Sequence, residues 1–245
     1  MIAVDDLQQP APNHSPAGLQ LESALALLRH AGHGEPKLER GSTEWLQAVI
    51  DSLVDLSSRD PLTGLANRRN VELALAREVD RVARSGESAL LLMVDIDHFK
   101  RVNDSFGHAT GDSVIQMVGR ALAETVRPMD LVARIGGEEF AVVLPNCPTS
   151  FAPQVADRVR QRVARHAVQL ADGREVKVTV SVGGAFAPQW VRSTPKLWLE
   201  RADRQLYRAK SEGRDRVCLE ASASSAVSAE ERGLLFAATP GQDEQ

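Results

Sequence analysis

The sequence predicts a domain of the α/β (α+β) class, with a central β-sheet surrounded by helices. Residues 89–94 form a continuously apolar run, which is typical of a strand covered on both faces. Two further strand-like runs flank Gly136-Gly137, and a glycine pair in this position indicates a β-hairpin because glycine tolerates positive φ. Segments with helical periodicity separate these strands, so helices are available to cover the sheet.

The composition is that of a globular protein with one main domain. The chain has 245 residues, of which 43% are hydrophobic and 25% are charged. Cys147 and Cys218 have no partner at metal-ligand spacing, so we expect neither a zinc site nor a disulfide framework, and a reducing cytoplasm fits best. The longest apolar run is too short to span a bilayer, and the first residues lack a signal-peptide pattern. We therefore expect no membrane insertion.

Charge is distributed unevenly along the chain. The net charge is −4 overall, and residues 1–58, 59–220 and 221–245 contribute −5, +4 and −3. A mildly basic centre between acidic ends suits a phosphate-bearing ligand, although chance surface charge explains it equally well on this evidence alone. No basic cluster indicates a nucleic-acid groove, so no nucleic-acid partner is expected.

Residues 1–58 are expected to form a short helical N-terminal extension, which serves as a dimerisation stalk or a regulatory segment. Residues 1–16 are rich in Pro, Asn and Gln and indicate a loose end, whereas the leucines between 21 and 28 share one face of a short helix. A second helix is predicted over 43–56. Its a/d seam consists of Leu46, Val49, Leu53 and Leu56. This stripe predicts either a brief coiled coil or packing within the chain itself.

Helices and strands alternate through residues 59–220, the expected main domain. Residues 67–84 have apolar side chains on one side and a Ser-Gly end signal, which predicts a helix. After the buried strand, helical patterns occur over 99–106 and 112–126. The hairpin follows, and then a helix near 151–166.

The last elements of the domain follow the same rules. Residues 176–182 alternate between apolar and polar side chains, which predicts a half-buried strand. Residues 195–211 form the last strong helical pattern, and a short strand over 216–219 closes the domain. Residues 221–245, dominated by Ser, Ala, Gly and Glu, are expected to form a disordered tail.

Acidic residues follow the buried strand directly. Asp95 and Asp97 lie two apart, so in extended backbone they share a face, and the carbonyl of Ile96 lies at the same end of the strand. These are hard oxygen ligands of the kind that Mg²⁺ prefers. A capping role for the next helix is the favoured interpretation of Asp97.

The turn of the hairpin carries two more carboxylates, Glu138 and Glu139. Taken alone, they are equally well explained by the solvation of a turn. If the hairpin strands flank the strand that ends at Asp95, however, Glu138 comes to lie beside Asp95. The two acids would then form a metal-binding mouth at one edge of the sheet.

Five ordered segments resemble the GGDEF family of diguanylate cyclases, with coverage from about residue 60 to residue 219. The segments are residues 60–69 (DPLTGLANRR), 95–104 (DIDHFKRVND), 106–112 (FGHATGD), 136–140 (GGEEF) and 202–214 (ADRQLYRAKSEGR). One departure is Asp215, which stands where the family often has Asn between two arginines. It puts only local phosphate contacts in doubt.

The resemblance implies a fold similar to the palm of nucleotide cyclases and polymerases, with a mixed sheet and the signature hairpin at its edge. It also implies that two GTP molecules condense into cyclic di-GMP with release of two pyrophosphates. This chemistry needs in-line geometry and neutralisation of phosphate charge by two Mg²⁺ ions per active site, or by Mn²⁺ in their place. One domain would hold one GTP, so catalysis would require a homodimer.

The resemblance also assigns roles to single residues. Asp95, the carbonyl of Ile96 and Glu138 would bind metal, Glu138 would also be the base toward the 3′-hydroxyl, and Glu139 would have a secondary catalytic role. Lys100 would place a cation near the phosphates. The remaining substrate-binding residues implied by the family are Asn103, His108 and Asp112 around the guanine nucleotide, and Lys210 and Arg214 at the terminal phosphates.

Some of these assignments have simpler readings. Lys210 and Arg214 lie four apart, which would place them on one helical face, and most such side chains point to water. His108 could equally make a local contact at the start of a helix.

Arg127-Pro128-Met129-Asp130 matches the RxxD product-binding motif of the family, five residues before the signature. Arginine can grip phosphate or stack on guanine, and a carboxylate can accept guanine donors, so this pair could bind cyclic di-GMP as an inhibitor. Arg158 on the following helix would add a second arginine. The simpler reading of the motif is a surface ion pair.

Two other functions stay open at this point. The domain could be a catalytically silent receptor that only binds cyclic di-GMP through Arg127, Asp130 and Arg158, although the intact signature argues against this. A cyclase that makes a monomeric cyclic nucleotide is disfavoured, because Asn103 and Asp112 fit the guanine pattern of the family.

Overall fold

A computed structural model describes residues 21–32, 34–189 and 193–221. The expectations of a loose end over residues 1–16 and of a disordered tail after residue 221 therefore lie outside the described residues.

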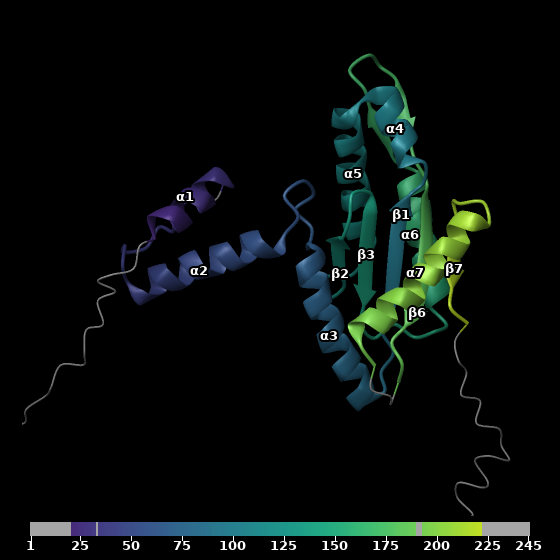
Figure 1. The fold of residues 1–245 in the computed structure, drawn as a ribbon, viewed down its shortest axis with the longest axis horizontal. Helices are drawn as coiled ribbons and strands as arrows, with labels where there is room; N and C mark the ends of the chain where they lie inside the picture. The colour runs from purple at the N-terminus through teal and green to yellow at the C-terminus, as the bar shows by residue number, and fades with distance from the viewer. Residues whose placement is uncertain (1–20, 33, 190–192, 222–245) are drawn as a thin grey trace, which may run out of the picture.

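A five-stranded mixed sheet forms the centre of the structure (Figure 1). The strands are β1 (Leu90–Ile96), β2 (Leu131–Arg134), β3 (Glu139–Leu144), β6 (Val180–Phe186) and β7 (Val217–Leu219). Their order is β2-β3-β1-β6-β7, and β6 and β7 are parallel whereas the other neighbours are antiparallel. The predicted α/β class with a mixed sheet is confirmed, and the hairpin β2–β3 forms one edge.

Two cores explain the continuous apolar run of β1. Leu90 and Leu92 point into one core, and Leu91 and Met93 into the other. The first core is covered by α4 (Phe99–Phe106), α5 (His108–Ala123) and α6 (Ala152–Ala164), and the second by α3 (Arg68–Ser85) and α7 (Pro195–Ser211). Every residue of β1 is buried, as a central strand covered on both faces requires.

Local signals set most of the helix ends. The side chain of Asn67 caps α3, which ends at Gly86 with a φ of 68°, and Thr194 caps α7. The predicted helix over 112–126 instead runs from His108 to Ala123. Gly107, with a φ of 80°, makes the tight turn that lets α5 start directly after α4.

The single strand predicted over 176–182 is wrong. β5 (Glu175–Lys177) pairs with β4 (Ala167–Gln169) in a separate two-stranded sheet, and β6 begins only at Val180. The backbone changes partner between them because the carbonyl of Thr179 accepts the N–H of Asp97 at the end of β1. Sequence alternation continues across this point, so it could not reveal the change.

The N-terminal extension contains α1 (Glu22–His30) and α2 (Thr43–Ser58), as predicted, and lies to one side of the sheet (Figure 1). Leu25 and Leu28 of α1 form a small core of their own with Trp45 and Val49 of α2, and Leu46, Leu53 and Leu56 pack against it, so the predicted seam of α2 packs within the chain. Outside this seam, Ile50 and Val54 of α2 are 52% and 59% exposed. Among the described residues, no helix has the length and apolarity needed to cross a membrane.

We predict that Gly183→Ala destabilises the protein by about 1–3 kcal/mol, because a Cβ there would overpack the contact between β6 and α7. That atom would lie 2.0 Å from the backbone nitrogen of Leu206. Gly34→Ala is the matched control, since its Cβ would meet nothing within 4 Å. Urea unfolding measures both variants, and equal stabilities would contradict this account of the packing.

Candidate functional site

The end of β1 meets the hairpin turn, as the sequence predicted. Asp95 lies directly opposite Glu139 in the antiparallel ladder between β1 and β3, and the N–H of Ile96 donates to the carbonyl of Glu138 at 3.2 Å. Residues directly opposite one another in such a ladder have their side chains on the same face. The hairpin therefore brings Glu138 and Glu139 to the end of the strand that carries Asp95.

A lysine from α7 completes this cluster. The Nζ of Lys210 lies 2.7 Å from Oδ2 of Asp95, whose side chain is 9% exposed against 33% for that of Lys210. Lys210 sits in the last turn of α7, and α7 packs along β1 and β6. The packing of one helix thus places a cation on a buried carboxylate 115 positions earlier in the chain.

The environment of Asp95 disfavours its charge. Burial raises the pKa of Asp95 above its usual value, and the nearby carboxylates of Glu138 and Glu139 raise it further, whereas Lys210 only partly offsets these effects. The single ammonium of Lys210 does not fully compensate this carboxylate, so a divalent cation would stabilise its charge better. A raised pKa of this kind is common at functional sites, although structural ion pairs also shift pKa values.

The oxygen atoms here fit a hard divalent cation of the Mg²⁺ type. Carboxylates from two strands and the carbonyl of Ile96 lie at one strand end. Among the described residues, however, no three acidic, His or Cys side chains gather closely enough to hold a metal by themselves. An ion at this edge would therefore take further oxygens from water or from a phosphate ligand, as Mg²⁺ commonly does.

An ion pair that the sequence did not predict supports the turn. Arg134 donates to the carbonyl of Gly137 at 2.9 Å and to Asp60 at 3.1 Å. Burial alone would raise the pKa of Asp60, but hydrogen bonds from Thr63 and the charge of Arg134 lower it overall. Asp60 opens the segment of residues 60–69, so that segment anchors the hairpin. In the sequence, Asp60 stands out only as the first residue of the segment 60–69, and no role was assigned to it there.

A second group of predicted residues gathers between α4 and α5. A Cβ added at Gly111 would lie 2.0 Å from Oδ1 of Asn103, so the amide of Asn103 packs directly against the glycine before Asp112. Oδ1 of Asn103 is buried and has no hydrogen-bond partner among the described residues. An orphaned acceptor of this kind is rare in a folded protein and indicates a missing donor from a ligand or water. Asp112 itself is exposed next to it.

Three other predicted site residues make none of the contacts described above. Lys100 and His108 are exposed near the starts of α4 and α5. Arg214 does not share a helical face with Lys210, so this prediction is wrong. Helix α7 ends at Ser211, and Arg214 lies in the following turn with a φ of 60°.

The prediction that Asp97 caps the next helix is also wrong. His98 occupies the cap position of α4, with no side-chain hydrogen bond, and the carboxylate of Asp97 binds elsewhere. It accepts hydrogen bonds from Thr179, Ser181 and the backbone of Asp215. These partners come from segments far along the chain, which local capping rules do not consider.

The predicted inhibitory residues lie at the turn between α5 and β2. The backbone N–H of Arg127 donates to Oδ2 of Asp130 at 2.8 Å, and the N–H of Asp130 donates to the carbonyl of Arg127 at 2.9 Å. Burial raises the pKa of Asp130, while the backbone hydrogen bond from Arg127 and the charges of Arg127 and Arg158 act to lower it. Arg158 also donates to the carbonyl of Thr125 at 3.0 Å.

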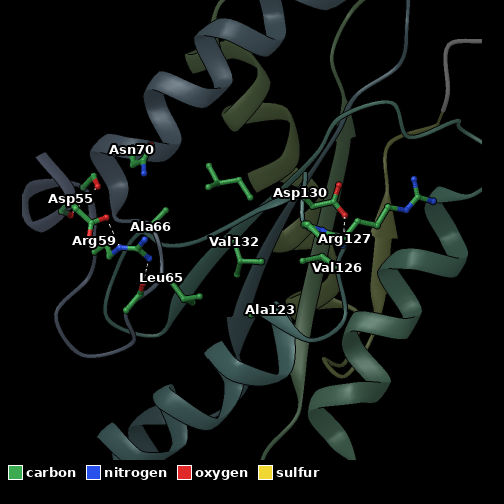
Figure 2. A pocket seen from close by; sticks show the side chains of 14 residues that line it. Asp55, Arg59, Leu65, Ala66, Asn70, Ala123, Val126, Arg127, Asp130 and Val132 are labelled. Atoms are coloured by element: carbon green, nitrogen blue, oxygen red, sulfur yellow. Dashed lines mark hydrogen bonds and ion pairs between the residues drawn. The ribbon is translucent and has the colours of Figure 1, made fainter. Parts of the chain in front are cut away.

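This turn forms one wall of a pocket of about 350 Å³, whose other wall is the end of α2 with Asp55 and Arg59 (Figure 2). The floor includes Leu65 and Val132. In Figure 2 the side chain of Arg127 extends away from the wall formed by α2, so its guanidinium remains available on the outer side of the turn.

Comparisons with known proteins all point to one family. A family model described as "Diguanylate cyclase, GGDEF domain" matches residues 57–216. The response regulator PleD of Caulobacter vibrioides is 40% identical over 176 residues, which are 71% of this chain and 38% of PleD. The chain thus spans less than half the length of this relative.

Solved structures agree with the sequence match. The coiled coil and GGDEF domain of DgcB from Caulobacter crescentus, in complex with c-di-GMP, is similar with a TM-score of 0.68 and 30% identity, covering 82% of this chain and all of that one. The active GGEEF domain of a diguanylate cyclase from Vibrio cholerae has a TM-score of 0.59 and 29% identity, covering 65% of this chain and 99% of that domain.

We predict that Asp95→Asn stabilises the metal-free protein at pH 7. The pKa of Asp95 is raised on folding, so its contribution to stability is present below the unfolded pKa and is lost as the pH rises through the folded pKa. A neutral side chain avoids that loss, and the melting temperature should rise by about 2–4 °C for each kcal/mol gained. Thermal unfolding in a chelator checks this.

The advantage of Asp95→Asn should shrink as the pH falls through the raised pKa of Asp95, because the wild-type carboxylate is then itself protonated. Asp104→Asn, at an exposed position of α4, serves as a control that should not shift the melting temperature in this manner. A variant less stable than the wild type at pH 7 would show that the Lys210 pair outweighs burial.

Proposed function

The chain belongs to the GGDEF family of diguanylate cyclases, and we propose that it condenses two GTP molecules into cyclic di-GMP with release of two pyrophosphates. The observation that carries the proposal is the meeting of Asp95 with the Glu138-Glu139 turn, with Lys210 bound to Asp95. The same GGEEF signature names a domain from Vibrio cholerae that is described as active.

Asp95, the carbonyl of Ile96 and Glu138 would hold Mg²⁺, or Mn²⁺ in its place, with two ions per active site. Bound there, divalent cations would neutralise phosphate charge and favour ionisation of the attacking hydroxyl. Glu138 would accept the proton of the 3′-hydroxyl, and Glu139 would assist it. Binding of cations beside Asp95 would also remove the unfavourable environment that raises its pKa.

Basic residues at the same end of the sheet would bind the phosphates. Lys210 would exchange its contact with Asp95 for the terminal phosphates once cations neutralise that carboxylate. Arg214 in the turn after α7 and Lys100 at the start of α4 are exposed and free to join it. Together they would orient the α-phosphate for in-line attack.

Asn103 of α4 and Asp112 of α5 would read guanine. The unpartnered Oδ1 of Asn103 would accept from N1–H or the 2-amino group, and the neighbouring carboxylate of Asp112 would accept the remaining donor. His108 at the start of α5 would support the nucleotide. An adenine ring has no donor at N1 and no 2-amino group, so this pair of acceptors would select guanine.

Catalysis would require two copies of the chain, since each domain would present one GTP to the other. Helix α2 offers a surface for this contact. Ile50 and Val54 are exposed beside the part of the stripe that α1 covers. The homodimer would thus use Ile50 and Val54 of α2, and a similar protein of known structure carries a coiled coil before its GGDEF domain.

Cyclic di-GMP would inhibit the enzyme at the turn of Arg127 and Asp130, with Arg158 as a further cation. Asp130 fixes the turn by accepting the backbone N–H of Arg127, which leaves the guanidinium exposed. That guanidinium could grip phosphate or stack on guanine.

We predict that the wild type releases pyrophosphate from GTP and that Glu138→Ala lowers the rate by about 10²-fold or more, because it removes the general base. Pyrophosphate release, with the product identified by mass, measures this. The specific activity of the wild type should rise with protein concentration, as a catalytic dimer requires. Glu200→Gln, an exposed carboxylate on α7, is the control.

Full activity of Glu138→Ala would contradict its role as base. A wild-type protein that binds cyclic di-GMP but releases no pyrophosphate would belong to the receptor class instead.

We further predict that Arg127→Ala weakens inhibition by cyclic di-GMP by about tenfold or more, since it removes a charge-assisted contact of about 1.5–3 kcal/mol. The backbone bond between Arg127 and Asp130 survives this change, so the turn and the uninhibited rate should stay as they are. Inhibition constants compare the variant with Arg84→Ala, an exposed arginine on α3. Equal constants for wild type and Arg127→Ala would reject the inhibitory site.

A further inference from the structure

The carboxylate of Asp97 is buried at the end of β1 and joins three separate segments. It is 5% exposed and forms no ion pair within the described residues. Its Oδ1 accepts from Ser181 Oγ at 2.6 Å, and its Oδ2 accepts from Thr179 Oγ1 at 2.7 Å and from the N–H of Asp215 at 3.0 Å. A buried carboxylate is costly unless hydrogen bonds compensate it, so these donors are held firmly in place.

The turn that follows α7 is held in an unfavourable conformation. Gly213, Arg214 and Asp215 have φ values of 117°, 60° and 44°. Left-handed backbone is disfavoured for residues with a side chain, and two such residues in succession persist only where surrounding contacts impose them. The contacts here are the bond from Asp215 N–H to Asp97 and the bond from Arg214 N–H to the carbonyl of Ala209 at 3.0 Å.

A second restraint on this turn comes from α6. Arg160 Nη1 lies 2.7 Å from Oδ1 of Asp215, and Arg160 Nε also donates to Asp157 at 2.9 Å. The side chain of Asp215 therefore points to α6, while its backbone N–H binds the strand. The turn is clamped between β1 on one side and α6 on the other.

Asp95 in β1 and Asp97 directly after its end hold the end of α7 and the turn that follows it at two points. Asp95 binds the side chain of Lys210, and Asp97 binds the backbone of Asp215. Arg214 lies between these two attachments. Its backbone has no freedom to move without breaking one of them or relaxing the left-handed turn.

We propose that Asp97, together with the ion pair of Arg160 and Asp215, is a positioning residue for Arg214. The inference rests on the proposed function, in which Arg214 contacts the terminal phosphates of GTP. Asp97 itself touches no substrate. It holds the turn in the conformation that presents the guanidinium of Arg214 to phosphate, so that little side-chain and backbone freedom is lost on binding.

The test is a double-mutant cycle read from binding to the full chain. The ligands are guanosine 5′-(α,β-methylene)triphosphate, which cannot release pyrophosphate, and guanosine, which lacks phosphates. Asp97→Asn keeps the size of the side chain but turns an amide toward groups that are themselves donors. We expect it to weaken triphosphate binding about tenfold and to leave guanosine binding unchanged.

Arg214→Ala should weaken triphosphate binding similarly, and adding Asp97→Asn to it should change the affinity by no more than about twofold, because residues that act through one another are not additive. The inference is overturned if the two effects multiply, if Asp97→Asn leaves triphosphate affinity unchanged, or if it weakens guanosine equally. The last result would mark a general structural role.

If Asp97→Asn fails to fold, as judged by thermal unfolding, Arg160→Gln takes its place in the same cycle. Arg162→Gln is the matched control, because Arg162 lies on the same helix but pairs with Glu124 at 2.6 Å. The inference is supported if Arg160→Gln weakens triphosphate binding in the wild-type background but not in the Arg214→Ala background. No loss, or an equal loss in Arg162→Gln, overturns it.

Binding and product formation by the wild-type chain test the proposed function separately from the role of Asp97. A wild-type chain that binds the triphosphate no better than guanosine overturns both the proposed function and this inference. A chain that binds the triphosphate but makes no cyclic di-GMP overturns the proposed activity alone, and the binding cycle still decides the role of Asp97.

Discussion

The structure depends on how the end of β1 accommodates two carboxylates in a buried position. Asp95 belongs to a strand that is otherwise wholly apolar, and Asp97 follows directly after that strand; the two buried carboxylates are compensated in different ways. Asp97 is satisfied by three neutral donors, whereas Asp95 has one lysine and two neighbouring acids, which leaves its pKa raised. One carboxylate thus stabilises the framework, and the other stays available to cations.

The short strand β2 connects the two candidate ligand sites. It begins directly after Asp130, in the turn proposed to bind the inhibitor, and ends at Arg134, which supports the Gly137 turn and binds Asp60. The two sites are therefore joined by four residues of paired strand and share one rigid edge of the sheet. Helix α6 contacts both regions, because Arg158 donates to the carbonyl of Thr125, just before the turn of Arg127, and Arg160 holds Asp215.

In the N-terminal extension, the apolar residues of α2 have two different surroundings. Trp45 and Val49 of α2 are buried against α1, while Ile50 and Val54 of the same helix are exposed. The seam of Leu46, Val49, Leu53 and Leu56 was compatible with packing inside the chain or with a coiled coil. The structure packs this seam inside the chain, and the exposed apolar residues Ile50 and Val54 lie outside it.

The sequence by itself determined the class of the fold, its helices and most of its strands, and the presence of acidic residues at a strand end and in a hairpin turn. These features depend on local periodicity and glycine signals, which neighbouring residues encode. Only the tertiary structure decided that Arg214 leaves the helix of Lys210, that residues 176–182 serve two sheets, and that Asp97 binds Thr179, Ser181 and Asp215 instead of capping α4. Those partners lie 82, 84 and 118 positions from Asp97, and such contacts follow from the packing of whole elements, which no local pattern records.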